Sequence, residues 1–214
     1  MSPIPPAFAP MLGQLQRDLL ATSPLELLAA ALGIVYVVLI VRRQRFGWVA
    51  GGVSSAMYVW LAAGAHLPMQ SGLQLFYVFM SFYGWWSWTR NQREEHGRIA
   101  SWPWPRHALA VVLIVALSFA SARWLAGQLD AAWPLLDSLT TLGSLYATWL
   151  VARSVLQNWL YWIVLDAITI FLFARQGHPV TAGLYLCFLL IAARGFFTWR
   201  RLLSAQARTP PVDQ

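Results

Sequence analysis

Long apolar segments that recur along the chain constrain its fold more than any other feature. A helix rises 1.5 Å per residue, so about 20 residues cross the roughly 30 Å hydrocarbon core of a bilayer. Continuous apolar runs are typical of spanning helices, whereas spanning strands show short alternating runs. Seven continuous segments with few or no charges lie at 24–41, 46–65, 70–89, 106–126, 133–152, 157–175 and 180–199. We therefore predict an all-α polytopic membrane protein with seven transmembrane helices.

The composition agrees with this prediction and excludes other classes of protein. Of 214 residues, 58% are hydrophobic and only 11% are charged. The net charge of +7 does not indicate nucleic-acid binding, because every basic residue is an arginine and most lie at segment ends. One cysteine, Cys187, and four scattered histidines predict no disulfide, no metal site and no cofactor. Residues 1–23 lack the features of a signal peptide, and we interpret them as an extracytoplasmic segment that could form an interfacial helix.

The distribution of arginines predicts the orientation in the membrane. With seven crossings, 11 of the 15 arginines fall on one side and 3 on the other, while Arg194 lies within the seventh segment. The positive-inside rule then places the N-terminus outside and the C-terminus in the cytoplasm. The polar stretch 90–107 is expected to be a cytoplasmic surface linker.

An internal repeat divides the chain into two related units. At an offset of 110, Pro24 matches Pro134, Tyr36 matches Tyr146 and Arg43 matches Arg153; at an offset of 111, Trp48 matches Trp159, Gly84 matches Gly195 and Trp88 matches Trp199. We place the one-residue gain in the first short loop. Because one helix links two three-helix units, both units run in the same direction, in a 3+1+3 arrangement with a site expected near the midplane between them. The predicted regions are 1–23, the first repeat 24–90, a connector with the linker helix at 91–132, the second repeat 133–201, and a tail at 202–214.

A carboxylate near the centre of the sixth segment is the main candidate for function. An Asp at the middle of a spanning helix costs about 2.5–3.5 kcal/mol, so Asp166 is expected to have a role. Trp162 at i−4 and Trp159 at i−7 share its helical face. Indole faces attract cations and stack on flat rings, and a carboxylate in a low dielectric binds a cation strongly. This combination favours a small, flat, cationic heteroaromatic ligand.

Further candidates are side chains that hydrogen-bond polar groups of such a ligand: Asn158 and Tyr161 beside that face, Gln74 and Tyr77 on the third segment, and Tyr58 on the second. Two alternatives for Asp166 stay open, an ion pair with Arg194 and a proton-carrying role. The tryptophans near the cytoplasmic boundary are expected in an interfacial aromatic belt, namely Trp85, Trp86, Trp88 and Trp199.

The chain resembles the PnuC-type vitamin transporters in "YGWWSW" at 83–88, in "TWLVARSVLQNWLYWIVLD" at 148–166 and in its 3+1+3 duplication. The resemblance implies a bacterial inner-membrane facilitator for nicotinamide riboside, in a family with thiamine and riboflavin relatives. It also implies a SWEET-like fold, a homotrimer, and functional coupling to a cytoplasmic kinase that phosphorylates the vitamin.

One departure from the family pattern affects the expected substrate. The position of Asp166 is an asparagine in the pattern of nicotinamide riboside carriers, and a carboxylate raises the odds of thiamine as the alternative. Two other classes of protein were weighed. An intramembrane enzyme would need a nucleophile with a positioned base, which the sequence does not offer, and a structural subunit would leave the buried carboxylate without a ligand. We predict a transporter and not an enzyme.

Overall fold

The computed structural model describes residues 23–65, 68–94, 97–125, 133–177 and 179–208. Within these ranges the chain forms helices and no strand, which confirms the all-α fold class. The helices are α2 (Pro24–Val41), α3 (Phe46–Gly64), α4 (Pro68–Glu94), α5 (Trp104–Leu125), α6 (Pro134–Ala152), α7 (Asn158–Arg175) and α8 (Pro179–Gln206). The expected interfacial helix within residues 1–23 lies, apart from Ser23, outside the described residues.

Proline begins four of these helices, and polar turns extend two of them. α2, α4, α6 and α8 each start at a proline, which fits the first helical turn because its missing N–H has no partner there anyway. α4 has 27 residues and α8 has 28, so both continue beyond the apolar segments that predicted them. Five of the described helices are long and apolar enough to cross a membrane, and the two others, α4 and α6, carry more polar side chains.

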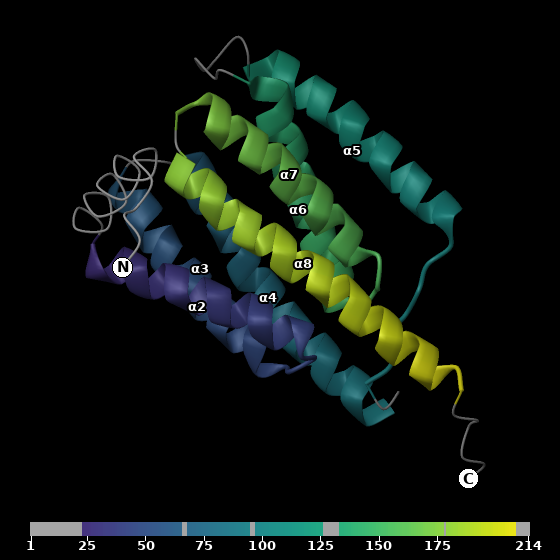
Figure 1. The fold of residues 1–214 in the computed structure, drawn as a ribbon. Helices are drawn as coiled ribbons and strands as arrows, with labels where there is room; N and C mark the ends of the chain where they lie inside the picture. Colours follow the sequence, from purple (N-terminus) through teal and green to yellow (C-terminus); the bar gives the residue numbers. More distant parts are fainter. Residues whose placement is uncertain (1–22, 66–67, 95–96, 126–132, 178, 209–214) are drawn as a thin grey trace, which may run out of the picture.

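The helices pack as two groups of three with α5 at the edge (Figure 1). α3 packs against α2 and α4, and α7 packs against α6 and α8. Between the groups the contacts are reciprocal: the third helix of each group, α4 or α8, contacts the first helix of the other, α6 or α2. Among the described helices, the backbone of α5 packs on α6, and its His107 side chain also contacts Tyr161 of α7. This reciprocity supports the duplicated 3+1+3 arrangement that we propose from the sequence.

The turns after α2 and α6 have the same geometry and correct the placement of the additional residue. Arg43 and Ser154, which are 111 residues apart, both have positive φ angles, 59° and 57°. α2 has 18 residues and α6 has 19, and they end at positions 111 apart although they begin 110 apart. The additional residue therefore lies within α6, and its expected position in the loop is wrong. We call the end of the bundle that carries these turns, 42–45 and 153–157, the Arg-rich end.

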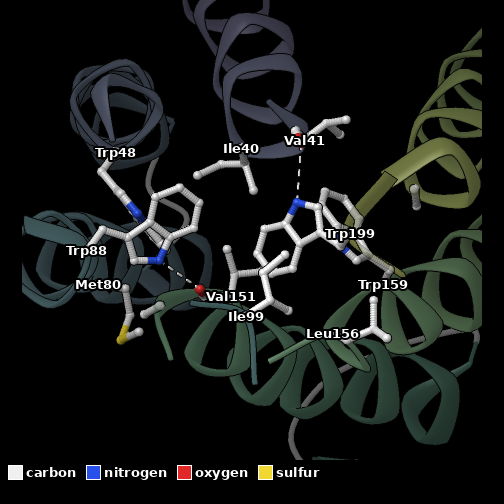
Figure 2. Packing of buried hydrophobic residues seen from close by; sticks show 12 residues of the cluster. Ile40, Val41, Trp48, Met80, Trp88, Ile99, Val151, Leu156, Trp159 and Trp199 are labelled. Carbon is white, nitrogen blue, oxygen red and sulfur yellow. Dashed lines mark hydrogen bonds between the residues drawn. The ribbon is translucent and has the colours of Figure 1, made fainter. Parts of the chain in front are cut away.

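Four buried indoles form the centre of the core, and we call them the tryptophan tetrad (Figure 2). Trp48 meets Trp88 edge to face at 5.7 Å between ring centroids, and Trp159 meets Trp199 in the same way at 5.4 Å. Trp88 and Trp199 join the two pairs at 6.0 Å. Both are at most 1% exposed, so their expected place in an interfacial belt is wrong.

Trp88 and Trp199, which we call the outer indoles because they contact Arg43 at the Arg-rich end, also hydrogen-bond across the repeats. Trp88 Nε1 donates to the carbonyl of Val151 near the end of α6 at 3.0 Å, and Trp199 Nε1 donates to the carbonyl of Val41 at the end of α2 at 3.2 Å. Carbonyls in the last turn of a helix have no intrahelical partner. Each repeat thus satisfies a terminal carbonyl of the other.

The connector between α4 and α5 packs closely on the Arg-rich end. Gln157 donates from Nε2 to Ser101 Oγ and to the carbonyl of Trp102, and its Oε1 accepts from the Trp102 N–H. Ile99 is 4% exposed and donates its N–H to Gln206 Oε1. The expectation of a surface linker is therefore wrong for Ile99, whereas Arg98 and Ser101 are exposed as expected.

Candidate ligand-binding cavity

A cavity of about 310 Å³ lies between the two groups of helices. Its volume is at the lower end of the range for small-molecule sites, and its walls are mostly apolar with a few polar groups. Trp48 and Trp159 border it, so the tryptophan tetrad separates it from the turns of the Arg-rich end. The lining residues are Gly33, Tyr36, Val37, Ile40, Trp48, Gly51, Ser54, Ser55, Tyr58, Gln74, Tyr77, Ser81, Thr148, Val151, Trp159, Trp162, Asp166, Tyr185, Phe188 and Ala192.

Most of the lining consists of positions that are equivalent in the repeat. Eight pairs separated by 111 residues account for 16 of the 20 lining residues. The pairs are Val37 with Thr148, Ile40 with Val151, Trp48 with Trp159, Gly51 with Trp162, Ser55 with Asp166, Gln74 with Tyr185, Tyr77 with Phe188, and Ser81 with Ala192. The cavity therefore lies where an axis relating the two repeats would run, as carriers built from repeats require.

Asp166 lines this cavity from the middle of α7 and has no counter-ion among the described residues. Its side chain is 6% exposed and forms no hydrogen bond or ion pair with any described residue. Arg194 is exposed on α8 and is not paired with it, which argues against the alternative of a structural ion pair. A buried carboxylate without a counter-ion is costly, and a cationic ligand or protonation of the carboxylate would each remove that cost.

The two indoles predicted beside this carboxylate also line the cavity. Trp159 is 2% exposed, and its edge-to-face contact with Trp199 fixes the ring at the end of the cavity. Trp162 is half-buried, one turn closer to Asp166. An aromatic surface and a carboxylate thus face the same space.

Three of the predicted polar residues reach the cavity from α3 and α4. Tyr77 donates its hydroxyl to Ser144 Oγ at 2.7 Å, which ties α4 to α6 across the wall. Gln74 lies one turn earlier on α4, half-buried, and forms no hydrogen bond with a described residue. Tyr58 is half-buried and lines the wall formed by α3. These side chains offer amide and hydroxyl groups to a ligand.

The other two predicted residues, Asn158 and Tyr161, do not line the cavity. Asn158 is completely buried, and its Nδ2 donates to the carbonyl of Val155 in the turn before α7. The hydroxyl of Tyr161 lies 3.1 Å from Nδ1 of His107 on α5, on the other side of α7. The structure therefore does not bring these two residues together with the other predicted site residues.

Sequence reasoning missed three aromatic side chains of the lining. Tyr36 on α2 and Tyr185 and Phe188 on α8 all border the cavity. Tyr185 and Phe188 are the repeat equivalents of Gln74 and Tyr77, so the repeat offset could have identified them. In the sequence, Tyr36 was noted only because it matches Tyr146 in the internal repeat.

Arg43 connects both repeats and the connector beneath the tetrad. Its guanidinium carbon lies 4.4 Å from the centroid of the Trp88 ring and 4.9 Å from that of Trp199. Nη1 donates to Ser154 Oγ at 2.8 Å, and Nη2 donates to the carbonyl of Gly97 at 2.9 Å. Burial lowers the pKa of Arg43 from 12.5 to about 10, so it remains a cation at neutral pH.

These features define the class of protein. A polytopic helical bundle whose cavity lies between two similar three-helix groups is the architecture of a membrane carrier. The family model described as "Nicotinamide mononucleotide transporter" matches residues 23–201. The chain belongs to this family, and the resemblance to PnuC-type transporters is confirmed.

Curated relatives agree with this assignment. The "Nicotinamide riboside transporter PnuC" of Escherichia coli is 28% identical over 153 residues, 59% of this chain and 64% of that protein. The protein of the same name from Haemophilus influenzae is 25% identical over 191 residues, 85% of this chain and 81% of that protein. The "Riboflavin/roseoflavin transporter RibM" of Streptomyces davaonensis is 22% identical over 81% of this chain and 83% of that protein. These relatives are transporters, which confirms that the chain is not an enzyme.

A solved structure supports the fold. The "Crystal structure of the Vitamin B3 transporter PnuC" superposes with a TM-score of 0.68 and 23% identity, covering 91% of this chain and 89% of that one. The match to the Escherichia coli relative spans less than two thirds of that protein's length. The chain is thus a multi-pass membrane protein of a vitamin-transporter family.

Proposed function

We propose that this protein facilitates the uptake of a small, flat, cationic vitamin by alternating access, with the substrate bound in the cavity between the repeats. The observation that carries the proposal is the unpaired carboxylate of Asp166, buried at 6% exposure in a wall that also contains Trp162 and Trp159. A buried charge without a partner is costly, and a cationic ligand offsets that cost where a neutral one does not.

Nicotinamide riboside is the leading substrate and thiamine is the alternative. Relatives named as nicotinamide riboside transporters support the first. The carboxylate of Asp166, where the family pattern has asparagine, favours the second. Both molecules carry a cationic aromatic ring, a pyridinium or a thiazolium, that fits a carboxylate beside indoles. Neutral riboflavin gains least from this carboxylate.

The proposal includes the setting of the protein in the cell. The arginine distribution supports an inner-membrane location with the N-terminus outside and the C-terminus in the cytoplasm. A homotrimer, and trapping of the vitamin by a cytoplasmic kinase, are further parts of the proposal that come from the family resemblance. Transport without ion coupling predicts equal uptake with and without a proton gradient, which proteoliposomes would measure.

The experiment that tests the site is isothermal titration of purified protein with thiamine, nicotinamide riboside and riboflavin. Wild type is compared with Asp166→Asn, which keeps the shape of the side chain and removes its charge. Loss of a desolvated charge partner costs about 2 kcal/mol or more, so we expect the affinity for the preferred cation to fall about 30-fold. Asp137→Asn, an exposed carboxylate at the start of α6, is the matched control and should bind as wild type does.

The outcomes separate the substrates. If wild type prefers thiamine and Asp166→Asn loses that preference, the carboxylate selects the substrate. If nicotinamide riboside binds tightly to both proteins, Asp166 replaces the asparagine of the family without selecting thiamine. Binding of riboflavin in preference to both cations would contradict the proposal.

A further inference from the structure

The wall of the cavity opposite Trp162 contains a glycine at the position equivalent in the repeat. Gly51 on α3 is 111 residues before Trp162 on α7, and both line the cavity. The second repeat thus presents an indole where the first presents no side chain. Any aromatic surface that the first repeat presents at this level of the cavity has to come from a residue other than Gly51.

Tyr36 of α2 supplies that surface by lying directly on Gly51. A Cβ atom added at Gly51 would stand 2.7 Å from Cδ2 and 3.1 Å from Cγ of the Tyr36 ring, which is closer than side chains can approach. The ring also contacts Trp48 at 5.8 Å between centroids, with the planes inclined by 59°. Because Gly51 has no side chain, the Tyr36 ring can pack against the backbone of α3 while it lines the cavity.

The tyrosine that matches Tyr36 in the second repeat does not share this position. The ring of Tyr146 packs on Trp149 at 5.7 Å and on Tyr161 at 5.2 Å, away from the cavity. The additional residue in α6 rotates the start of that helix by about 100° relative to the turn that follows it. Each repeat therefore contributes one aromatic wall at this level, Tyr36 in the first and Trp162 in the second.

We propose that Tyr36, seated on Gly51, is a specificity-determining residue that forms with Trp162 the two walls of a clamp for a planar ring. The inference rests on the proposed function and deepens it, because it assigns the selection of a flat ring to a pair of aromatic walls and the selection of charge to Asp166. An aromatic side chain can stack on any planar ring. The free energy of this stacking is large enough to decide the affinity.

The test is titration of thiamine and nicotinamide riboside into the full-length protein and three variants. Tyr36→Leu removes the ring, Tyr36→Phe keeps it, and Tyr146→Leu is the matched control because Tyr146 lies off the cavity. Removing a stacked aromatic side chain typically weakens binding about 5- to 150-fold. We expect Tyr36→Leu to bind the preferred probe at least tenfold more weakly, and Tyr36→Phe and Tyr146→Leu to bind within about twofold of wild type.

A second pair of variants keeps the test decisive if Tyr36→Leu does not fold. Gly51→Ala displaces the Tyr36 ring, whereas Gly72→Ala on α4 meets nothing within 4 Å. We expect the first to weaken binding of the planar probe and the second to leave it unchanged. Unchanged affinity in both Tyr36→Leu and Gly51→Ala, with wild type binding tightly, would overturn the clamp while the proposed function stands. A wild type that binds neither probe would instead overturn the proposed function and the clamp with it.

Discussion

Replacing Arg43 by glutamine is predicted to destabilise the Arg-rich end far more than the same replacement of Arg42. Arg43 makes two hydrogen bonds and two indole contacts, and these join the α2–α3 turn to Ser154, to Gly97 and to both outer indoles of the tetrad. Its neighbour Arg42 is exposed in the same turn. The comparison of the two arginines separates the contacts of the guanidinium from a general effect of charge.

The magnitude follows from the contacts and from the cost of burying the cation. Hydrogen bonds from a charged donor are worth about 1.5–3 kcal/mol each, and cation–π contacts about 0.5–2 kcal/mol each. The fall of the Arg43 pKa from 12.5 to about 10 corresponds to a burial cost of about 3 kcal/mol. The contacts exceed this cost by a few kcal/mol. We expect Arg43→Gln to lower the free energy of unfolding by about 2–4 kcal/mol.

The assay is thermal unfolding of the purified protein in detergent. For a chain of this size, 2–4 kcal/mol corresponds to a fall in Tm of roughly 5–15 °C. Arg42→Gln should shift Tm by no more than about 2 °C. Because the pKa of about 10 keeps Arg43 protonated, the difference between wild type and Arg43→Gln should be constant from pH 6 to pH 9. Equal Tm values for the two glutamine variants would refute the reasoning.

Two further substitutions test the packing around the cavity and the connector. A Cβ at Gly195 would lie 2.7 Å from Cδ2 of the Trp159 ring, so Gly195→Ala should cost about 1–3 kcal/mol by thermal unfolding, whereas Gly183→Ala on the same helix meets nothing within 4 Å and should stabilise slightly. Gln157→Ala removes three hydrogen bonds to the connector, and we expect a loss of about 2–3 kcal/mol together with faster hydrogen exchange at the Trp102 N–H; unchanged exchange would show that the connector does not depend on Gln157.

The helices could be predicted from the sequence because hydropathy and proline positions report directly on spanning segments. The apolar segments 24–41 and 157–175 coincide with α2 and α7 to within one residue. α4 and α8 were predicted too short because their last turns are polar. A hydropathy profile detects only the apolar stretch that crosses the hydrocarbon core of the membrane. A helix that continues into water is polar there, and hydropathy gives no sign of where it ends.

Among the proposed site residues on α7, those that share the helical face of Asp166 line the cavity, and those chosen only for proximity in sequence do not. At about 100° per residue, Trp162 lies about 40° and Trp159 about 20° from the direction of Asp166 around the helix. Tyr161 lies about 140° away and Asn158 about 80°, and neither lines the cavity. The helical period alone is thus sufficient to separate Trp159 and Trp162, which line the cavity, from Asn158 and Tyr161, which do not.

The position of Tyr36 could not be obtained from the repeat in the same way. The sequence pairs it with Tyr146, and both tyrosines keep the same register relative to the proline at the start of their helices. Which side chains face the cavity depends instead on their distance in sequence from the turn that follows α2 or α6. A single residue added in α6 separates these two registers. Only the three-dimensional structure shows which tyrosine faces the cavity.

The buried indoles near the Arg-rich end are matched between the repeats, whereas the residues at the middle of the cavity are not. Trp48 and Trp159 are identical, and the outer indoles Trp88 and Trp199 bond reciprocally across the repeats. About two turns further into the membrane, by contrast, the equivalent residues have different chemistry, as Ser55 with Asp166 shows. The proposed alternating access requires two units that move alike, which favours nearly symmetric packing at the Arg-rich end. A single asymmetric substrate bound on an axis meets both units at once, so charge is needed on one side only, and a second carboxylate there would add a buried charge without a partner.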